Sequence, residues 1–235
     1  GALMVSGFFG ILLNLERAVA LQKTWAYIGS VLAAVGSVAI IPTPSSAFGP
    51  MLLTTSSVFL TGLFVYALQR QRALHTAIMG LGALSWLAGN LLWILGMPIY
   101  QFVGWWMGFI LFTIIGERLE LGKLVKQSRR SRGILLLVLL GYLLFAAFAL
   151  VNLSLGIRLS GVALIACALW LLSQDIVRVT IRMGGLAKYI AYCLAIGYGW
   201  LLVAGGLAAY FGGQSSGLVY DAYLHSFFIG FTFSM

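Results

Sequence analysis

Charged residues are scarce in this chain of 235 residues. Asp, Glu, Lys and Arg make up 8% of the sequence, whereas a soluble domain has about 25%. Because so few charges cannot cover a surface that faces water, a soluble globular protein is excluded. Cysteine is also rare: Cys167 and Cys193 both lie inside apolar segments, so no disulfide framework is predicted.

Acidic residues are the rarest charged type, with only five in the chain. Four lie at the ends of apolar segments that adjoin basic loops. Asp221 lies at the end of an apolar segment that adjoins a loop without basic residues. This argues against a proton- or sodium-coupled transporter with a carboxylate at the membrane midplane, although an ion site built from backbone carbonyls stays open. The sequence also lacks a nucleotide-binding loop, zinc-ligand spacing and a cleavable signal peptide.

Long apolar runs dominate what is present, since 62% of the residues are hydrophobic. A helix needs about 20 such residues to span a membrane. We therefore predict an all-α, polytopic transmembrane helix bundle that forms a single domain over 1–235 and has the lipid bilayer as its partner. Both ends of the sequence fall inside apolar runs that are predicted to be helical, so we expect the chain to be a fragment. The nine predicted spans are 2–21, 24–41, 50–68, 74–95, 98–115, 133–153, 155–172, 186–211 and the truncated 221–235.

The loop charges predict an orientation. Thirteen of the 14 basic residues fall after the first, third, fifth and seventh spans, and only Arg158 falls in an alternate loop. Cytoplasmic loops carry the excess of Lys and Arg, so residue 1 is predicted on the periplasmic side of a bacterial inner membrane and the basic loops in the cytoplasm. The net charge of +9 does not indicate nucleic-acid binding, because the cations separate apolar segments.

One signature occurs twice. Gly7-Phe8 precedes Glu16-Arg17, and Gly108-Phe109 precedes Glu117-Arg118 at the same spacing, 101 positions later. Because both copies run from outside to inside in the predicted topology, we expect a parallel repeat of four helices. Gly230-Phe231 would open a third copy. The predicted repeats are about 1–96, about 97–212 and a start at about 219–235.

The acid-base pairs of this signature are interpreted mainly as structural ion pairs. Interfacial Arg anchors with a neighbouring Glu are routine at helix ends, although a proton entry point is the functional alternative. Glu120 lies three residues after Glu117 and so on the same helix face. A pairing of Arg118 with Glu16 across helices is a further hypothesis.

The two histidines are the candidate cofactor and metal ligands. His225 lies in the ninth segment near its outer end, and histidine in a membrane tends to be functional. His75 opens the fourth span at the cytoplasmic end, where an interfacial role is the simpler interpretation. The two cannot share one metal in a protomer, because the apolar core between them is about 30 Å thick. Met4, Met51 and Met97 are soft residues near the outer side, with packing as their simpler role.

Intramembrane amides form a second group of polar residues. Asn14 lies in the first span, while Trp86, Asn90 and Trp93 lie about one helical face apart on the fourth. We expect them to make hydrogen bonds between helices.

Four groups of segments carry a resemblance to a known family: 1–10 with 15–21, 75–80 with 89–93, 116–121, and 221–225 leading into Gly230-Phe231. They resemble NnrS-like membrane proteins of bacteria. The resemblance implies haem and copper as cofactors, a role in the response to nitric oxide, and three groups of four helices as in subunit I of the haem-copper oxidases. The family has a histidine in the first turn of its first helix, which here would lie just upstream of Gly1 or be absent.

The predicted function is therefore that of an NnrS-like inner-membrane protein that binds haem or copper through His225 and acts in nitric-oxide or metal-stress handling. Two alternatives stay open: a transporter or permease without a cofactor, and an assembly subunit of a membrane complex. A homo-oligomer or a partner in a membrane complex also stays open, and enzymatic activity is undecided.

Overall fold

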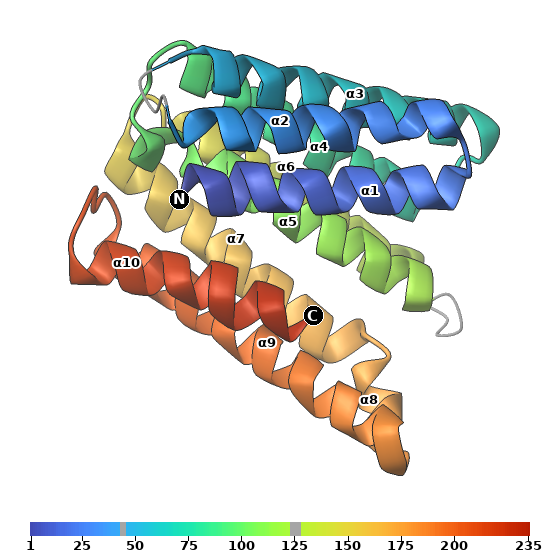
Figure 1. The fold of residues 1–235 in the computed structure, drawn as a ribbon. Coiled ribbons are helices and arrows are strands. Elements are labelled where there is room, and N and C mark those ends of the chain that lie inside the picture. The colour runs from blue at the N-terminus through green and yellow to red at the C-terminus, as the bar shows by residue number, and fades with distance from the viewer. Residues whose placement is uncertain (43–45, 123–127) are drawn as a thin grey trace. The chain divides into compact units, whose positions relative to one another are not determined.

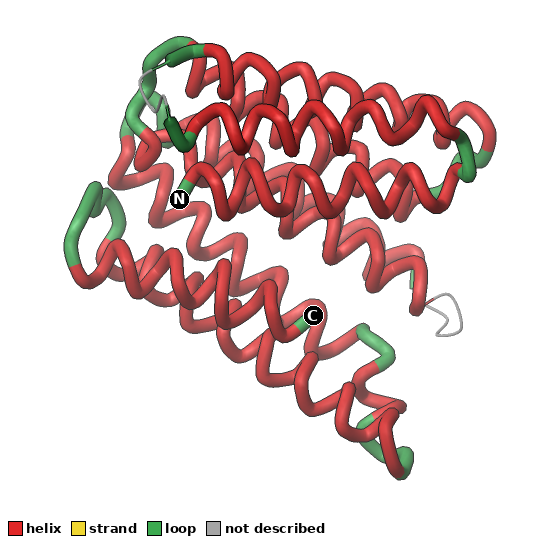
Figure 2. Tube along the Cα trace, in the orientation of Figure 1, coloured by secondary structure: helices red, strands yellow, loops and turns green. Residues whose placement is uncertain are grey.

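The computed structural model describes residues 1–42, 46–122 and 128–235, and all of its regular elements in these ranges are helical (Figure 2). The prediction of an all-α chain is thus confirmed for this part of the molecule. Pro44 in the predicted break after the second span, and Lys123 and Lys126 in the most basic loop, lie outside the described residues.

The chain divides into two compact units, Gly1–Gly116 and Glu117–Met235. In the first unit a π-helical turn, Leu3–Phe8, leads into α1, and a 3-10 turn, Thr24–Tyr27, leads into α2. The unit's helices are α1 (Phe9–Leu21), α2 (Ile28–Ile40), α3 (Phe48–Arg70), α4 (Leu74–Ile94) and most of α5 (Ile99–Leu121) (Figure 1).

The second unit begins with the last turn of α5. A π-helical turn, Ser226–Phe231, and a 3-10 turn, Thr232–Ser234, follow its last α-helix. Its helices are α6 (Arg129–Phe148), α7 (Leu153–Gln174), the one-turn α8 (Val177–Thr180), α9 (Gly185–Phe211) and α10 (Leu218–His225).

Seven helices of the described residues are long and apolar enough to cross a membrane. This supports a multi-pass membrane protein. The second predicted span is a shorter apolar helix, Thr24–Ile40, and the ninth is divided among α10 and the π and 3-10 turns after it. The second helix ends one residue before the predicted end at 41, and the ninth begins at Leu218, before the predicted start at 221. Neither reaches the length of the seven candidate spans.

Side-chain caps fix the starts of two helices in the second unit. Ser128 Oγ accepts a hydrogen bond from Ser131 N at 3.0 Å and begins α6. Asn152 Oδ1 accepts one from Leu155 N at 3.0 Å and begins α7. Both bonds satisfy a backbone donor that the first helical turn leaves without an acceptor.

Small residues bring neighbouring helices of the first unit together. A Cβ on Gly36 of α2 would lie 3.1 Å from Gly49 O of α3. A Cβ on Gly82 of α4 would lie 2.9 Å from Phe109 O of α5. Close backbone approach of this kind is typical of helices packed in a membrane.

The loops of the first unit alternate between its two ends. Figure 1 shows the α1–α2 and α3–α4 connections at one end, and the α2–α3 and α4–α5 connections at the other. The basic residues of this unit therefore gather at the first of these ends: Arg17, Lys23, Arg70 and Arg72.

Candidate functional site

The ring of His225 is held by the backbone of its own helix. α10 begins after Gly217, whose φ of 91° favours glycine, and His225 is its last residue. His225 Nδ1 lies 2.7 Å from Asp221 O, one turn earlier. Because a carbonyl oxygen only accepts hydrogen bonds, Nδ1 carries the proton and donates it. The lone pair of the neutral imidazole is then on Nε2.

His225 lies on the face of α10 that turns away from the rest of the second unit. Tyr223 and Phe227 on the other face are buried, whereas His225 is exposed. The segment packs closely on α9, since a Cβ on Gly230 would lie 2.5 Å from Trp200 Cγ. The exposed imidazole therefore sits on a helix whose opposite face is anchored.

The arrangement suits one ligand of a metal. A backbone carbonyl on one ring nitrogen fixes the tautomer and the orientation of a metal-binding imidazole, and Nε2 of His225 would be the atom that holds a haem iron or copper. No group of three or more His, Cys, Asp and Glu side chains that could hold a metal ion is found among the described residues.

The other proposed ligands belong to the first unit. His75 is half-buried at the start of α4 and has an interaction within the molecule. Met4 and Met51 are exposed, and Met97 is half-buried. None of these four residues is in the unit that contains His225.

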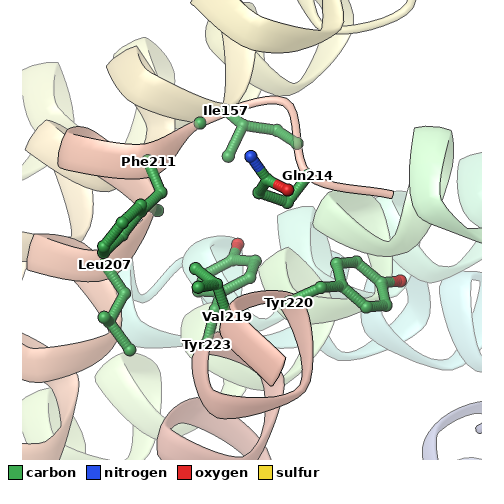
Figure 3. Close-up of a pocket in the computed structure, with 9 residues that line it drawn as sticks. Ile157, Leu207, Phe211, Gln214, Val219, Tyr220 and Tyr223 are labelled. Atoms are coloured by element: carbon green, nitrogen blue, oxygen red, sulfur yellow. The ribbon is translucent and has the colours of Figure 1, made fainter. Parts of the chain in front are cut away.

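A small pocket lies beside the first turn of α10 (Figure 3). It encloses about 10 Å³, room for about one water molecule, opens to the surroundings, and has mostly apolar walls from α7, α9 and α10. Arg158 Nη2 donates to Phe211 O at 3.3 Å next to it. His225 is not part of its wall. The lining residues are Ile157, Leu207, Ala208, Phe211, Gly212, Gln214, Val219, Tyr220 and Tyr223.

The charged pairs of the repeated signature differ in their surroundings. Glu16 forms an ion pair with Arg17, the next residue. The Cζ atom of Arg17 also lies 5.8 Å from the centre of the Phe64 ring. Glu117 and Glu120 each have an interaction within the molecule. The Nε atom of Arg118 is buried without a hydrogen-bond partner. A bond between Arg118 and Glu16 would join the two units and stays a prediction.

A buried acid at the end of α7 was not singled out from the sequence. Asp175 is 5% exposed, and its oxygens accept hydrogen bonds from Tyr198 Oη and, at 2.7 Å, from Ile176 N. The only signal in the sequence was an Asp at the end of an apolar run. Its partner Tyr198 lies 23 positions later on another helix, and no local pattern indicates that distance.

The amides and indoles of the first unit form the expected hydrogen bonds between helices. Asn90 Oδ1 accepts from Ser6 Oγ at 2.9 Å and from Trp106 Nε1 at 3.0 Å, and Trp86 Nε1 donates to Ser6 Oγ at 2.8 Å. Trp93 stacks edge-to-face on Trp106 with ring centres 5.5 Å apart. The four hydrogen-bonded side chains are fully buried, and the network joins the π-helical turn Leu3–Phe8 to α4 and α5.

Comparison with known proteins gives one result. No curated protein and no solved structure matches this chain. One family profile matches all of residues 1–235. The chain therefore belongs to the DUF8744 family, a domain of unknown function.

Proposed function

We propose that this protein is a multi-pass protein of the bacterial inner membrane that binds haem iron or copper through Nε2 of His225 and acts in the response to nitric oxide or metal stress. The observation that carries the proposal is the 2.7 Å contact between His225 Nδ1 and Asp221 O, on an exposed face of an apolar segment. A histidine side chain inside a membrane costs free energy, so it tends to be found there only where it has a function.

The chain's own contribution is to hold the imidazole ready for a metal. The Asp221 carbonyl fixes the tautomer and the orientation of the ring, and the turn Ser226–Phe231, with Phe227 and Phe231 buried, packs on α9. When bound, haem or copper would supply one-electron chemistry or binding of a small gas molecule. The resemblance to NnrS-like proteins suggests nitric oxide as that gas.

We further propose nine spans, with residue 1 and Asp221 on the periplasmic side and the basic loops in the cytoplasm. The helices Thr24–Ile40 and Leu218–Ser234 would complete the count. A 17-residue helix is about 26 Å long, close to the thickness of the apolar core.

A shared irregularity supports the four-helix repeat. When Gly7-Phe8 is aligned with Gly230-Phe231, the π-helical turn Leu3–Phe8 coincides with the π-helical turn Ser226–Phe231 at every residue. Such turns are rare and often mark functional sites. The corresponding part of α5 is a regular α-helix, so the second copy does not share this feature.

The experiment is the optical spectrum and metal content of the purified protein. We expect a Soret band or bound copper, and its loss in His225→Ala. Leu218→Ala, at an exposed residue of the same helix, is the matched control and should keep the signal. Gel filtration of both variants separates a lost ligand from a lost fold.

Two outcomes would overturn parts of the proposal. An unchanged signal in a folded His225→Ala variant would remove this residue as the ligand. Absence of haem and of metal in the parent protein would reject the cofactor, and substrate flux in liposomes would then favour a permease.

A further inference from the structure

Six exposed basic side chains gather at one end of the second unit, where α7 ends and α6 and α9 begin. We name this surface the basic rim. Trp170 Nε1 of α7 donates to Ser131 O of α6 at 3.1 Å, which ties the two ends together. Arg178 Nη1 donates to Ser173 O at 3.0 Å. The basic rim consists of Arg129, Arg130, Arg132, Arg178, Arg182 and Lys188.

The stretch that carries the rim has little negative charge; Glu117 and Glu120 of the same unit lie outside it and have interactions of their own. Between Arg129 and Lys188 the sequence has one acid, Asp175. That carboxylate is buried and bonded to Tyr198 and Ile176, so it does not face the exposed cations. The charges of the rim are therefore not neutralised from within this stretch.

Helix dipoles add to the positive potential. α6 has three Arg residues in and beside its first turn, α9 has Lys188 there, and neither first turn contains an acid. The N-terminus of a helix already carries about half a positive charge, so added cations are unfavourable there unless an anion lies nearby. The arrangement thus favours a bound anionic group.

Apolar side chains lie among these cations. Leu186 is 73% exposed and Tyr189 is 66% exposed, with Val179 and Met183 about half exposed. Lys188 Nζ lies 5.8 Å from the centre of the Tyr192 ring. Nucleic acid or an acidic peptide would leave the apolar groups in water, whereas a bilayer surface takes up both the cations and the apolar groups.

We propose that the basic rim binds the phosphate groups of anionic phospholipids in the surrounding bilayer. The guanidinium and ammonium groups would contact the headgroups, and the side chains of Leu186 and Tyr189 would enter the acyl boundary. α8, which contains Arg178, lies beside the start of α9 in Figure 1.

The test measures lipids kept by the full chain. The protein is purified from vesicles of phosphatidylcholine mixed with phosphatidylglycerol, and retained lipid is counted by native mass spectrometry. We expect a preference for phosphatidylglycerol that falls roughly 30-fold in Arg178→Gln/Arg182→Gln, since each cation near a lipid surface contributes about a fivefold factor. Arg70→Gln/Arg72→Gln removes the same charge from exposed sites of the first unit. We expect a smaller effect there, because four basic residues instead of six share that end and Glu16 already pairs with Arg17.

Three results would overturn the proposal. These are equal binding of phosphatidylcholine by the parent protein, equal losses in the two double variants, and equal thermal stabilisation by inorganic phosphate and by phosphatidylglycerol. The last result would identify a free-anion site instead of a lipid surface. If the first double variant does not fold, Lys188→Gln and Arg182→Gln are measured singly and should each lower the preference about fivefold.

Discussion

At the scale of single residues, Asn14 shows how one buried amide fixes its neighbours. Its Nδ2 donates to Gly10 O at 2.8 Å and to Ser56 Oγ at 3.2 Å, and Ser56 Oγ donates to Gly29 O at 2.8 Å. The amide oxygen faces Gly29 on α2 and has no hydrogen-bond partner. A glycine is required there because Asn14 Oδ1 occupies the place of a Cβ.

We predict that Gly29→Ala destabilises the protein by about 1–3 kcal/mol, because the new methyl group overlaps Asn14 Oδ1 and lies 2.8 Å from Phe59 Cδ1. The measurement is thermal unfolding in detergent. Gly62→Ala is the matched control: its Cβ meets nothing within 4 Å, so its midpoint should stay the same or rise slightly. Equal midpoints for the two variants would contradict the close contact.

Histidine 225 belongs to the same scale. Its rarity and its place in an apolar segment were enough to single it out from the sequence. The tautomer of its imidazole could not be predicted from the sequence, because it depends on which backbone oxygen faces Nδ1. That oxygen is Asp221 O, and only the helical geometry of α10 brings it to 2.7 Å.

At the scale of elements, α7 and α9 touch through their backbones. A Cβ on Gly161 would lie 2.6 Å from Gly205 O, and a Cβ on Gly205 would lie 2.8 Å from Gly161 O. Backbone atoms cannot move aside as a flexible side chain can. The two glycines therefore set how closely the helices approach.

Gly205→Leu is predicted to separate α7 from α9, with a loss of about 3 kcal/mol or failure to fold, since the side chain would have to enter the backbone of α7. Gly206→Leu is the control on the next residue, where nothing lies within 4 Å. Fluorescence-detected gel filtration before and after heating compares the two. Similar profiles would show that the helices do not depend on this contact.

Hydropathy predicted where the long helices lie, but it predicted the residues at which they end less accurately. The fourth predicted span, 74–95, matches α4 closely. α5 continues past the predicted end at 115 to Leu121, because Glu117-Arg118 continues the helix beyond the apolar run. A charged residue ends a hydrophobic stretch without ending a helix.

At the scale of the whole molecule, the charge pattern makes a prediction about sidedness. In a background without Cys167 and Cys193, Ser216→Cys should react with a membrane-impermeant maleimide in intact cells. Gln71→Cys should react only after the inner membrane is opened. Both positions are exposed, so access alone does not separate them. The expectation rests on the excess of basic residues in cytoplasmic loops.

The reverse labelling pattern would invert the proposed orientation and place His225 nearer the cytoplasm. Labelling of both residues from one side would mean that the number of spans between positions 71 and 216 is even, which would remove the proposed topology.

Composition and periodicity alone determined that this is a helical protein suited to a membrane, and placed most of its long helices. They do so because hydropathy is a sum over single residues and needs no knowledge of contacts. Only the tertiary structure decided which polar groups meet: Ser6 with Asn90, 84 positions apart, and Asp175 with Tyr198. Such pairs depend on which faces of separate helices turn toward each other, and that is set by packing, which no local pattern encodes.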